Sequence, residues 1–194
     1  MLGLVLCGGH SSRMGTDKGL LKPENKTWSQ AAADKMRRLN IEVKISVNAS
    51  QFAAYSDLFD PADLICDNQS LSVHGPLLGV LTCHLKYPAE DLFVFACDMP
   101  LMESCLLDKL MNEYRLNSSY NAYIFCSDNK SEPLCGIYTA KGLAIIIDML
   151  REGRLERHSM KFTLDQLHVN LVPISEDQKK QFRNFNTHAD LNGL

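Results

Sequence analysis

The chain has 194 residues, of which 45% are hydrophobic and 22% are charged, and its formal net charge is −3. This length and composition are ordinary for a soluble globular protein and allow one domain, residues 1–194, to bury a full core. The mildly acidic balance gives no electrostatic reason to expect nucleic acid as a partner, and no apolar run is long enough to span a membrane.

The amino-terminal apolar run ends at Gly8, which is too short for a signal peptide, and no basic segment precedes it. The seven cysteines include no C-x-x-C pair, and most lie in apolar runs. We therefore expect buried, reduced thiols in a cytoplasmic protein, and a catalytic cysteine is the weaker interpretation. The six histidines show no spacing that suggests a zinc site.

Apolar runs alternate with helical patterns along the chain. The predicted strands cover residues 3–6, 42–47, 63–65, 92–96, 122–125, 136–138 and 168–172. The predicted helices cover residues 28–39, 77–86, 103–114, 140–152 and 160–164, and residues 117–132 are predicted as a polar loop with a strand inside it. The alternation predicts a Rossmann-like, three-layer α/β domain whose mostly parallel central sheet is covered by helices on both faces.

The first predicted strand runs into a glycine-rich loop, L-C-G-G-H-S-S-R-M-G-T-D-K, at residues 6–18. Glycines let the backbone approach a ligand closely and let several amides point at one anion. Arg13 adds a planar fork of donors and Lys18 adds a compact charge, and the two suit a polyphosphate. The spacing fits neither the P-loop nor the dinucleotide fingerprint, so the loop predicts a nucleotide-phosphate site of another kind.

Two segments that follow later strands are less specific when taken alone. Asn48 ends the strand at 42–47 and by itself indicates only a turn. The string D-N-Q-S-L-S-V-H-G-P-L-L-G runs from Asp67 to Gly79, and its Gly75-Pro76 step predicts a helix start, where unpaired backbone amides can meet a ligand. A loop followed by a helix explains this string equally well.

Asp98 ends the most apolar predicted strand, within A-C-D-M-P, and Pro100 stops that strand. A carboxylate in this place either caps the next helix or binds a metal ion. Because Glu103 and Ser104 are closer to the next predicted helix, metal binding is the favoured role for Asp98. Mg²⁺ is commonly held by one or two carboxylates together with substrate phosphate and water, so one aspartate suffices.

Two motifs near the carboxyl terminus have sufficient structural explanations. Glu132 opens E-P-L-C-G-I-Y, which predicts a strand with a polar beginning. The string F-R-N-F-N-T at residues 182–187 contains Asn184 and Asn186 and offers Thr187 as the N-cap of a last short helix.

Together the five motifs resemble, in chain order, those of the nucleotidyltransferases that make molybdenum cofactor dinucleotides, most closely the molybdenum cofactor guanylyltransferases (the MobA family). The resemblance covers residues 2 to about 191. It implies transfer of GMP from GTP to molybdopterin or the molybdenum cofactor, with Mg²⁺ as cofactor and pyrophosphate as the second product. It also implies transient contact with proteins of cofactor biosynthesis or with molybdoenzymes.

The same resemblance implies roles for individual residues. The implied catalytic residues are Arg13 and Lys18, at the β- and γ-phosphates, and Asp98, at Mg²⁺ and the α-phosphate. These three also count among the nucleotide contacts, and the others are Leu6, Cys7, Gly8, Gly9, Asn48, Asp67, Gly75, Pro76, Leu77 and Gly79. Glu132, Asn184 and Asn186 lie toward the acceptor.

The choice of base depends on two strings. Guanylyl members carry L-A-G-G and G-P-L-x-G, where cytidylyl members differ, and this chain has L-C-G-G at residues 6–9 and G-P-L-L-G at 75–79. Both strings favour guanine. A related enzyme that uses CTP or a different phosphorylated acceptor, such as a sugar phosphate, stays open, and so does a nucleotide-binding relative without catalysis. The short chain argues against the sugar enzymes, and the presence of Arg13, Lys18 and Asp98 argues against the non-catalytic relative.

Overall fold

The computed structural model describes residues 1–8, 17–23, 25–128 and 130–185. Within these residues, seven strands form one sheet in the order β3-β2-β1-β4-β6-β5-β7. The strands are β1 (Leu2–Leu6), β2 (Glu42–Val47), β3 (Leu64–Cys66), β4 (Leu92–Ala96), β5 (Ala122–Ser127), β6 (Lys130–Tyr138) and β7 (Val169–Pro173). All pairs are parallel except those of β6, which runs antiparallel to both β4 and β5. The mostly parallel sheet that the sequence predicts is confirmed.

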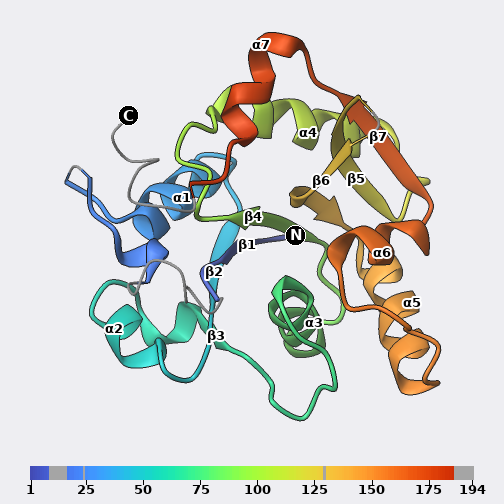
Figure 1. Cartoon of the computed structure of the whole chain (residues 1–194), viewed down its shortest axis with the longest axis horizontal. Coiled ribbons are helices and arrows are strands. Elements are labelled where there is room, and N and C mark those ends of the chain that lie inside the picture. The colour runs from blue at the N-terminus through green and yellow to red at the C-terminus, as the bar shows by residue number, and fades with distance from the viewer. Residues whose placement is uncertain (9–16, 24, 129, 186–194) are drawn as a thin grey trace.

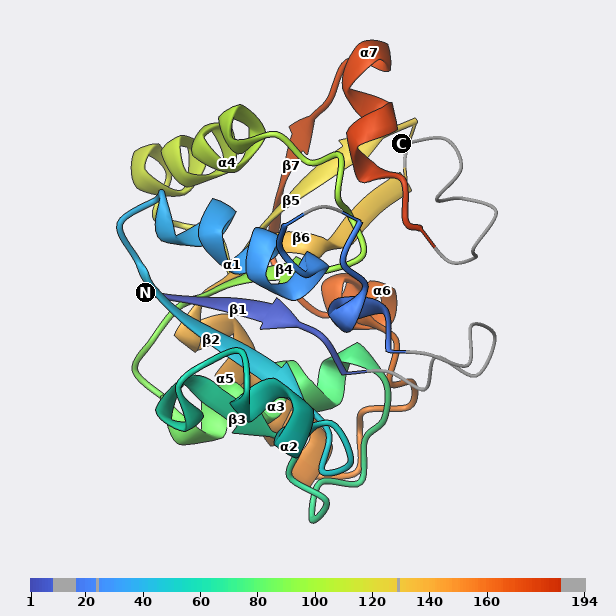
Figure 2. The same ribbon diagram turned by 90° about the vertical axis from the view of Figure 1, so that its left-hand side faces the viewer.

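Helices cover both faces of this sheet (Figures 1 and 2). The helices are α1 (Trp28–Arg37), α2 (Phe52–Ser56), α3 (Pro76–Lys86), α4 (Ser104–Leu116), α5 (Ala140–Arg151), α6 (Met160–Asp165) and α7 (Glu176–Lys179), with short 3₁₀ turns at Lys18–Leu20, Pro61–Asp63 and Lys180–Phe182. One hydrophobic layer packs under α1 and α4, and the other packs under α3, α5 and α6. The three-layer prediction is therefore confirmed.

The central strands explain why their sequences are so apolar. All five residues of β1 are buried, as are all five of β4, because each strand lies between two neighbours and under helices on both faces. Helices α1 and α5 begin where side chains satisfy free amides. Thr27 and Gln30 form a capping box at the start of α1, and Thr139 caps α5.

The predicted loop at residues 117–132 is shorter in the structure, because β5 and the start of β6 occupy most of it. β6 begins at Lys130 rather than at Gly136, and it forms a hairpin with β5, so Glu132 lies within a strand. The reason is a register shift, since Ile124 pairs with Gly136 but Cys126 pairs with Ser131. Pro133 falls in the irregular stretch between those pairs, where its missing N–H costs no ladder bond, and it therefore does not end the strand.

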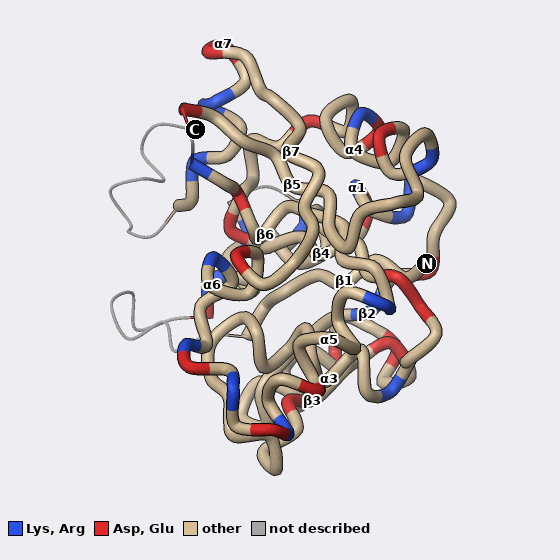
Figure 3. The backbone as a smooth tube through the Cα atoms, turned by 90° about the vertical axis from the view of Figure 1, so that its right-hand side faces the viewer, with Lys and Arg blue, Asp and Glu red and all other residues tan. Residues whose placement is uncertain are grey.

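Helices α2 and α7 were not expected, because five and four residues are too few to show a helical period. None of the helices in the described ranges has the length and hydrophobicity needed to cross a lipid bilayer. All seven cysteines fall within those ranges, and none forms a disulfide. Lys and Arg alternate with Asp and Glu along the chain instead of collecting on one element (Figure 3).

Candidate active site

The carboxyl ends of β1, β2 and β4 lie side by side, because the three strands are parallel neighbours. Backbone hydrogen bonds continue beyond the ladder. The amides of Cys7 and Gly8 both donate to the carbonyl of Ser46, at 3.0 and 3.1 Å, and the amide of Cys97 donates to the carbonyl of Leu6 at 3.2 Å. This edge therefore brings Gly8, Asn48 and Asp98 together from three separate parts of the sequence.

A cavity of about 620 Å³ opens at this edge, on the side of the sheet covered by α3. Its size is in the usual range for a small-molecule site. The residues that line it and that the resemblance also implies as nucleotide contacts are Leu6, Gly8, Asn48, Asp67, Gly75, Pro76 and Gly79. The other lining residues were not singled out from the sequence, although Gln69, Val73, His74 and Leu78 belong to the string from Asp67 to Gly79; the rest are Ser46, Ala49 and Ser50.

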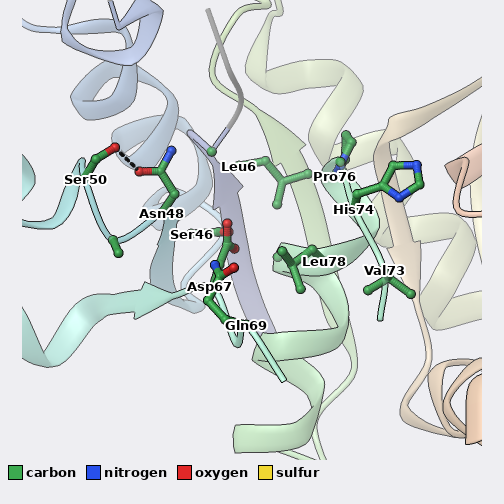
Figure 4. A pocket seen from close by; sticks show the side chains of 14 residues that line it. Leu6, Ser46, Asn48, Ser50, Asp67, Gln69, Val73, His74, Pro76 and Leu78 are labelled. Carbon is green, nitrogen blue, oxygen red and sulfur yellow. Dashed lines mark hydrogen bonds between the residues drawn. The ribbon is translucent and has the colours of Figure 1, made fainter. Parts of the chain in front are cut away.

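The two walls of the cavity differ in polarity (Figure 4). Ser46, Asn48 and Asp67 supply oxygen and nitrogen atoms on one wall, and Pro76 and Leu78 lie on the other. Asn48 also closes a turn, because its Oδ1 accepts hydrogen bonds from the hydroxyl of Ser50 at 2.7 Å and from the amide of Gln51 at 3.0 Å. Asn48 is therefore both a turn residue and a residue of the cavity wall.

Asp67 is the acidic group of the cavity. It follows β3, and its amide donates to the carbonyl of Val47 at 2.9 Å. Burial raises the pKa of its carboxyl above the ordinary value. A half-buried carboxylate on the wall of a cavity is suited to accept hydrogen bonds from a ligand that brings N–H or O–H donors.

The structure requires glycine at positions 75 and 79 for two different reasons. Gly75 precedes α3 with φ of 70° and ψ of −159°, a conformation that is essentially restricted to glycine. A Cβ on Gly79 would lie 2.3 Å from Oγ of Ser46 and 3.3 Å from Cδ2 of Leu6. Gly79 therefore lets α3 lie close against β1 and β2 and sets the depth of the cavity.

Cys7 and Leu77, which the resemblance implies as nucleotide contacts, do not line the cavity. The carbonyl of Cys7 accepts a hydrogen bond from Nε2 of Gln51 at 3.0 Å, and its amide is bonded to Ser46. Both backbone groups of Cys7 are thus already used within the protein. Leu77 is fully buried in the hydrophobic layer under α3.

Lys18 and Asp98 form an ion pair at the same edge, with 3.6 Å between Nζ of Lys18 and Oδ2 of Asp98. The side chains of both are about one-fifth exposed. Oδ1 of Asp98 is buried and has no hydrogen-bond partner among the described residues. Burial raises the pKa of this carboxyl, and the charge of Lys18 opposes the rise. A buried carboxylate oxygen that has no partner and lies beside a cation can bind a metal ion, or it can accept a hydrogen bond from a ligand.

Asp98 does not cap α4, whose N-cap position is occupied by Glu103. This observation removes the structural alternative that the sequence had left for Asp98. Its carbonyl instead accepts a hydrogen bond from the amide of Phe185 at 3.0 Å, which joins the end of the described chain to the site.

Asp17 anchors the end of the first loop. Its carboxylate accepts hydrogen bonds from the amide of Gly19 at 2.9 Å, from Nε2 of Gln51 at 2.6 Å and from the hydroxyl of Tyr55 at 3.1 Å. Tyr55 is fully buried in α2. The network fixes the position of Lys18 next in the chain. Nothing in the sequence pointed to Gln51 or Tyr55, because Tyr55 lies in a helix too short to be predicted and Gln51 lies at its N-cap position.

The residues implied for the acceptor are less closely grouped. Glu132 is half-buried in β6, and burial raises its pKa. Asn184 lies in the segment before Phe185, whose ring meets that of Trp28 edge to face with centroids 6.0 Å apart. Gly9, Arg13, Asn186 and Thr187 lie outside the described residues.

Comparisons with known proteins agree with this architecture. A probable molybdenum cofactor guanylyltransferase of Flavobacterium johnsoniae is 28% identical over 98% of this chain and 94% of its own length. A protein of the same description from a Geobacillus species is 29% identical over 100% of this chain and 97% of its own length.

Among solved structures, molybdopterin-guanine dinucleotide biosynthesis protein A of Archaeoglobus fulgidus matches with a TM-score of 0.78 at 21% identity, covering 100% of this chain and 96% of that one. At this identity the match shows the fold alone. The sequence pattern of the MobA-like NTP transferase domain matches residues 3–168. The chain belongs to the family of MobA-like NTP transferase domains.

Proposed function

We propose that this protein transfers GMP from GTP to molybdopterin or its molybdenum-bearing form, giving the guanine dinucleotide cofactor and pyrophosphate. The relatives named as guanylyltransferases support the proposal. The observation that carries it is the Lys18–Asp98 pair, which lies at the edge of the sheet where the cavity ends at Gly8.

In this proposal the nucleotide occupies two regions of the site. The cavity has the size and the polar wall for the base and ribose, with Asn48 and Asp67 as the contacting side chains. The phosphates then extend past Gly8 toward Lys18 and Asp98. Arg13 completes the phosphate contacts in this proposal, and Glu132, Asn184 and Asn186 are assigned to the acceptor side. The setting proposed for the reaction is the cytoplasm.

The chemistry needs little covalent participation from the protein. An oxygen of the terminal phosphate of the acceptor attacks the α-phosphorus, the bond to the β-phosphate oxygen breaks, and pyrophosphate leaves with that oxygen. Lys18 neutralises charge that builds up on the leaving phosphates. The fixed backbone at Gly8 and the Asp17 network hold the nucleotide in one orientation for the attack.

The residues also fit a bound Mg²⁺. Asp98 would hold it through its carboxylate, since Oδ1 is buried and has no hydrogen-bond partner in the described part of the chain. One protein carboxylate is sufficient because Mg²⁺ commonly fills its other positions with phosphate oxygens and water. When bound, the ion would neutralise phosphate charge and orient the α-phosphate.

Guanine selection is assigned to the backbones at Gly8 and at residues 75–79. Among the described residues, a Cβ on Gly8 would meet only Oδ2 of Asp67, at 3.7 Å, so Gly8→Ala should fold normally and place a methyl group at the cavity wall. We expect this variant to use GTP less well and to accept some CTP, measured as the ratio of kcat/KM for the two nucleotides. A GTP-to-CTP ratio equal to that of the wild type would refute the role of Gly8.

The experiment that tests the proposal has two parts. In the first, thermal unfolding is measured with GTP, CTP, ATP or UTP in the presence of Mg²⁺. A ligand at 100 times its Kd stabilises by about 2.7 kcal/mol, so GTP should raise the melting temperature most. In the second, GTP and molybdopterin are incubated with the protein, and pyrophosphate and the dinucleotide are measured. Faster turnover of CTP would replace the guanylyl proposal with the cytidylyl one, and absence of any dinucleotide product would refute both.

A further inference from the structure

Two histidines from distant parts of the chain meet at the rim of the nucleotide cavity. His74 lies directly before Gly75 and α3, and His158 lies in the segment that joins α5 to α6. Their Nδ1 atoms are 2.9 Å apart, and the ring centroids are 4.6 Å apart at an interplanar angle of 63°. His74 is exposed and His158 is partly exposed, so solvent reaches the pair.

Each ring presents the same nitrogen to the other. Two neutral imidazoles can share a hydrogen bond here only if one carries its proton on Nδ1 and the other on Nε2. With both rings in the Nε2–H form, the two Nδ1 lone pairs are available to a cation. Metal–imidazole bonds are about 2.0–2.1 Å long, so two nitrogens bound at 90° to each other lie about 2.8–3.0 Å apart. The observed separation of 2.9 Å equals this value and also that of a hydrogen bond between the two rings, and metal titration distinguishes the two.

We propose that His74 and His158 form a binding site for a divalent metal ion of the late first transition row, with Cu²⁺ and Ni²⁺ as the ions that best match a 90° angle. Imidazole nitrogen is a preferred ligand of these ions, and both favour square-planar or tetragonal arrangements. Mg²⁺ does not compete for the site, because it binds oxygen ligands.

The backbone beside each histidine is anchored before a metal binds. Val73, next to His74, is buried in the layer under α3. On the other side, Leu155 is buried in the same layer, and Ser159 caps α6 by accepting a hydrogen bond from the amide of Phe162 at 3.1 Å. Binding therefore orders only two side chains, which keeps the entropic cost small.

The site is open. Within the described ranges, no group of three or more His, Cys, Asp or Glu side chains is arranged around a common point. Water or a small ligand would fill the remaining positions, so the ion should exchange readily. The site uses neither Lys18 nor Asp98, so its failure and the failure of the proposed guanylyl transfer are separate results.

The test is titration of the full-length protein, stripped of metal, with Cu²⁺ or Ni²⁺ alone. The exposed thiols of Cys66 and Cys105 are first replaced by serine, because thiolates also bind these ions. Calorimetry measures affinity and stoichiometry, and electron paramagnetic resonance of the Cu²⁺ form reports whether nitrogen atoms are bound. His74→Ala and His158→Ala are compared with His168→Ala, which removes an exposed histidine that stacks on Tyr120.

We expect one ion per chain in the parent and in His168→Ala, with two imidazole nitrogens in the Cu²⁺ spectrum. Each of the other two variants should bind at least about tenfold more weakly, since even the loss of an outer-shell partner of a metal ligand costs about 10–100-fold in affinity. Melting temperatures without metal show that the variants are folded. Equal affinity in all three single variants, or a Cu²⁺ spectrum unchanged by His74→Ala, would overturn the proposal.

Discussion

Gly79→Ala separates two explanations of a glycine in the G-P-L-L-G string. If the glycine only makes room for a ligand, the substitution should leave the stability of the ligand-free protein unchanged or slightly higher. In the structure, however, the added Cβ would lie 2.3 Å from Oγ of Ser46, which is fully buried, and 3.3 Å from Cδ2 of Leu6. We therefore expect Gly79→Ala to destabilise the protein in the absence of any nucleotide.

The magnitude follows from two opposing effects. Overpacking a buried contact costs about 1–3 kcal/mol. Replacing glycine by alanine inside a helix returns up to about 1 kcal/mol. A net loss of about 1–2 kcal/mol corresponds to a fall of about 2–8 °C in melting temperature for a chain of this size.

The assay is thermal unfolding of four proteins that form a double-mutant cycle: the wild type, Gly79→Ala, Ser46→Ala and the double variant. Ser46→Ala removes Oγ, after which the nearest atoms to the new Cβ are those at 3.3 Å. The two changes should therefore be coupled, with Gly79→Ala costing at least about 0.5 kcal/mol less in the Ser46→Ala background. Gly8→Ala is the matched control, because it adds the same methyl group at the same cavity without a close contact to any described residue. If Gly79→Ala is as stable as the wild type, or if the loss is the same in both backgrounds, close packing against Ser46 is not the reason for this glycine.

Three further substitutions test the assigned roles. Asp98→Asn keeps the shape of the side chain but removes the charge that would bind Mg²⁺. Turnover should therefore fall by orders of magnitude, while the melting temperature stays close to that of the wild type. Near-normal activity at ordinary Mg²⁺ concentrations would refute the assignment. Lys18→Ala should weaken binding of GTP much more than binding of guanosine, as measured by calorimetry, and an equal loss for both would make Lys18 structural. Burial raises the pKa of Asp67, so the carboxyl of Asp67 stays protonated to higher pH in the folded chain than in the unfolded chain. The contribution of this carboxyl to the free energy of unfolding is therefore lost as pH rises through its folded-state pKa. Asp67→Asn should accordingly raise the melting temperature of the ligand-free protein at neutral pH and weaken nucleotide binding. It should also remove the part of the pH dependence that begins near about pH 4, the ordinary pKa of an aspartate. A lower melting temperature at neutral pH would contradict the sign.

The sequence by itself determined the fold class and most of the elements. Strands such as β1 and β4 are recognisable because burial on both faces makes them continuously apolar, and α5 because its caps and its helical period agree. The end of β4 also located Asp98 at the correct edge of the sheet. Local chemistry is sufficient for these features, since each is decided by residues close together in the chain.

Other features depend on residues that are far apart in the sequence. The start of β6 at Lys130 depends on pairing with β5 across a register shift, and the predicted strand at residues 136–138 did not extend that far. Whether a residue of a motif faces the cavity is decided by the pleat of the strand and by the rotation of the helix. Cys7 and Leu77 therefore lie in the hydrophobic layers, while Ser46, which no motif contains, lines the cavity.

Only the tertiary structure brought together the contacts that make a site. Lys18 and Asp98 are 80 positions apart in the chain, and His74 and His158 are 84 apart. The period of a strand or a helix shows which of its faces is apolar, but it carries no information on which side chains from other elements will meet that face. Those contacts are fixed when two close-packed layers form against one sheet, because only then are the carboxyl ends of β1, β2 and β4 held next to one another.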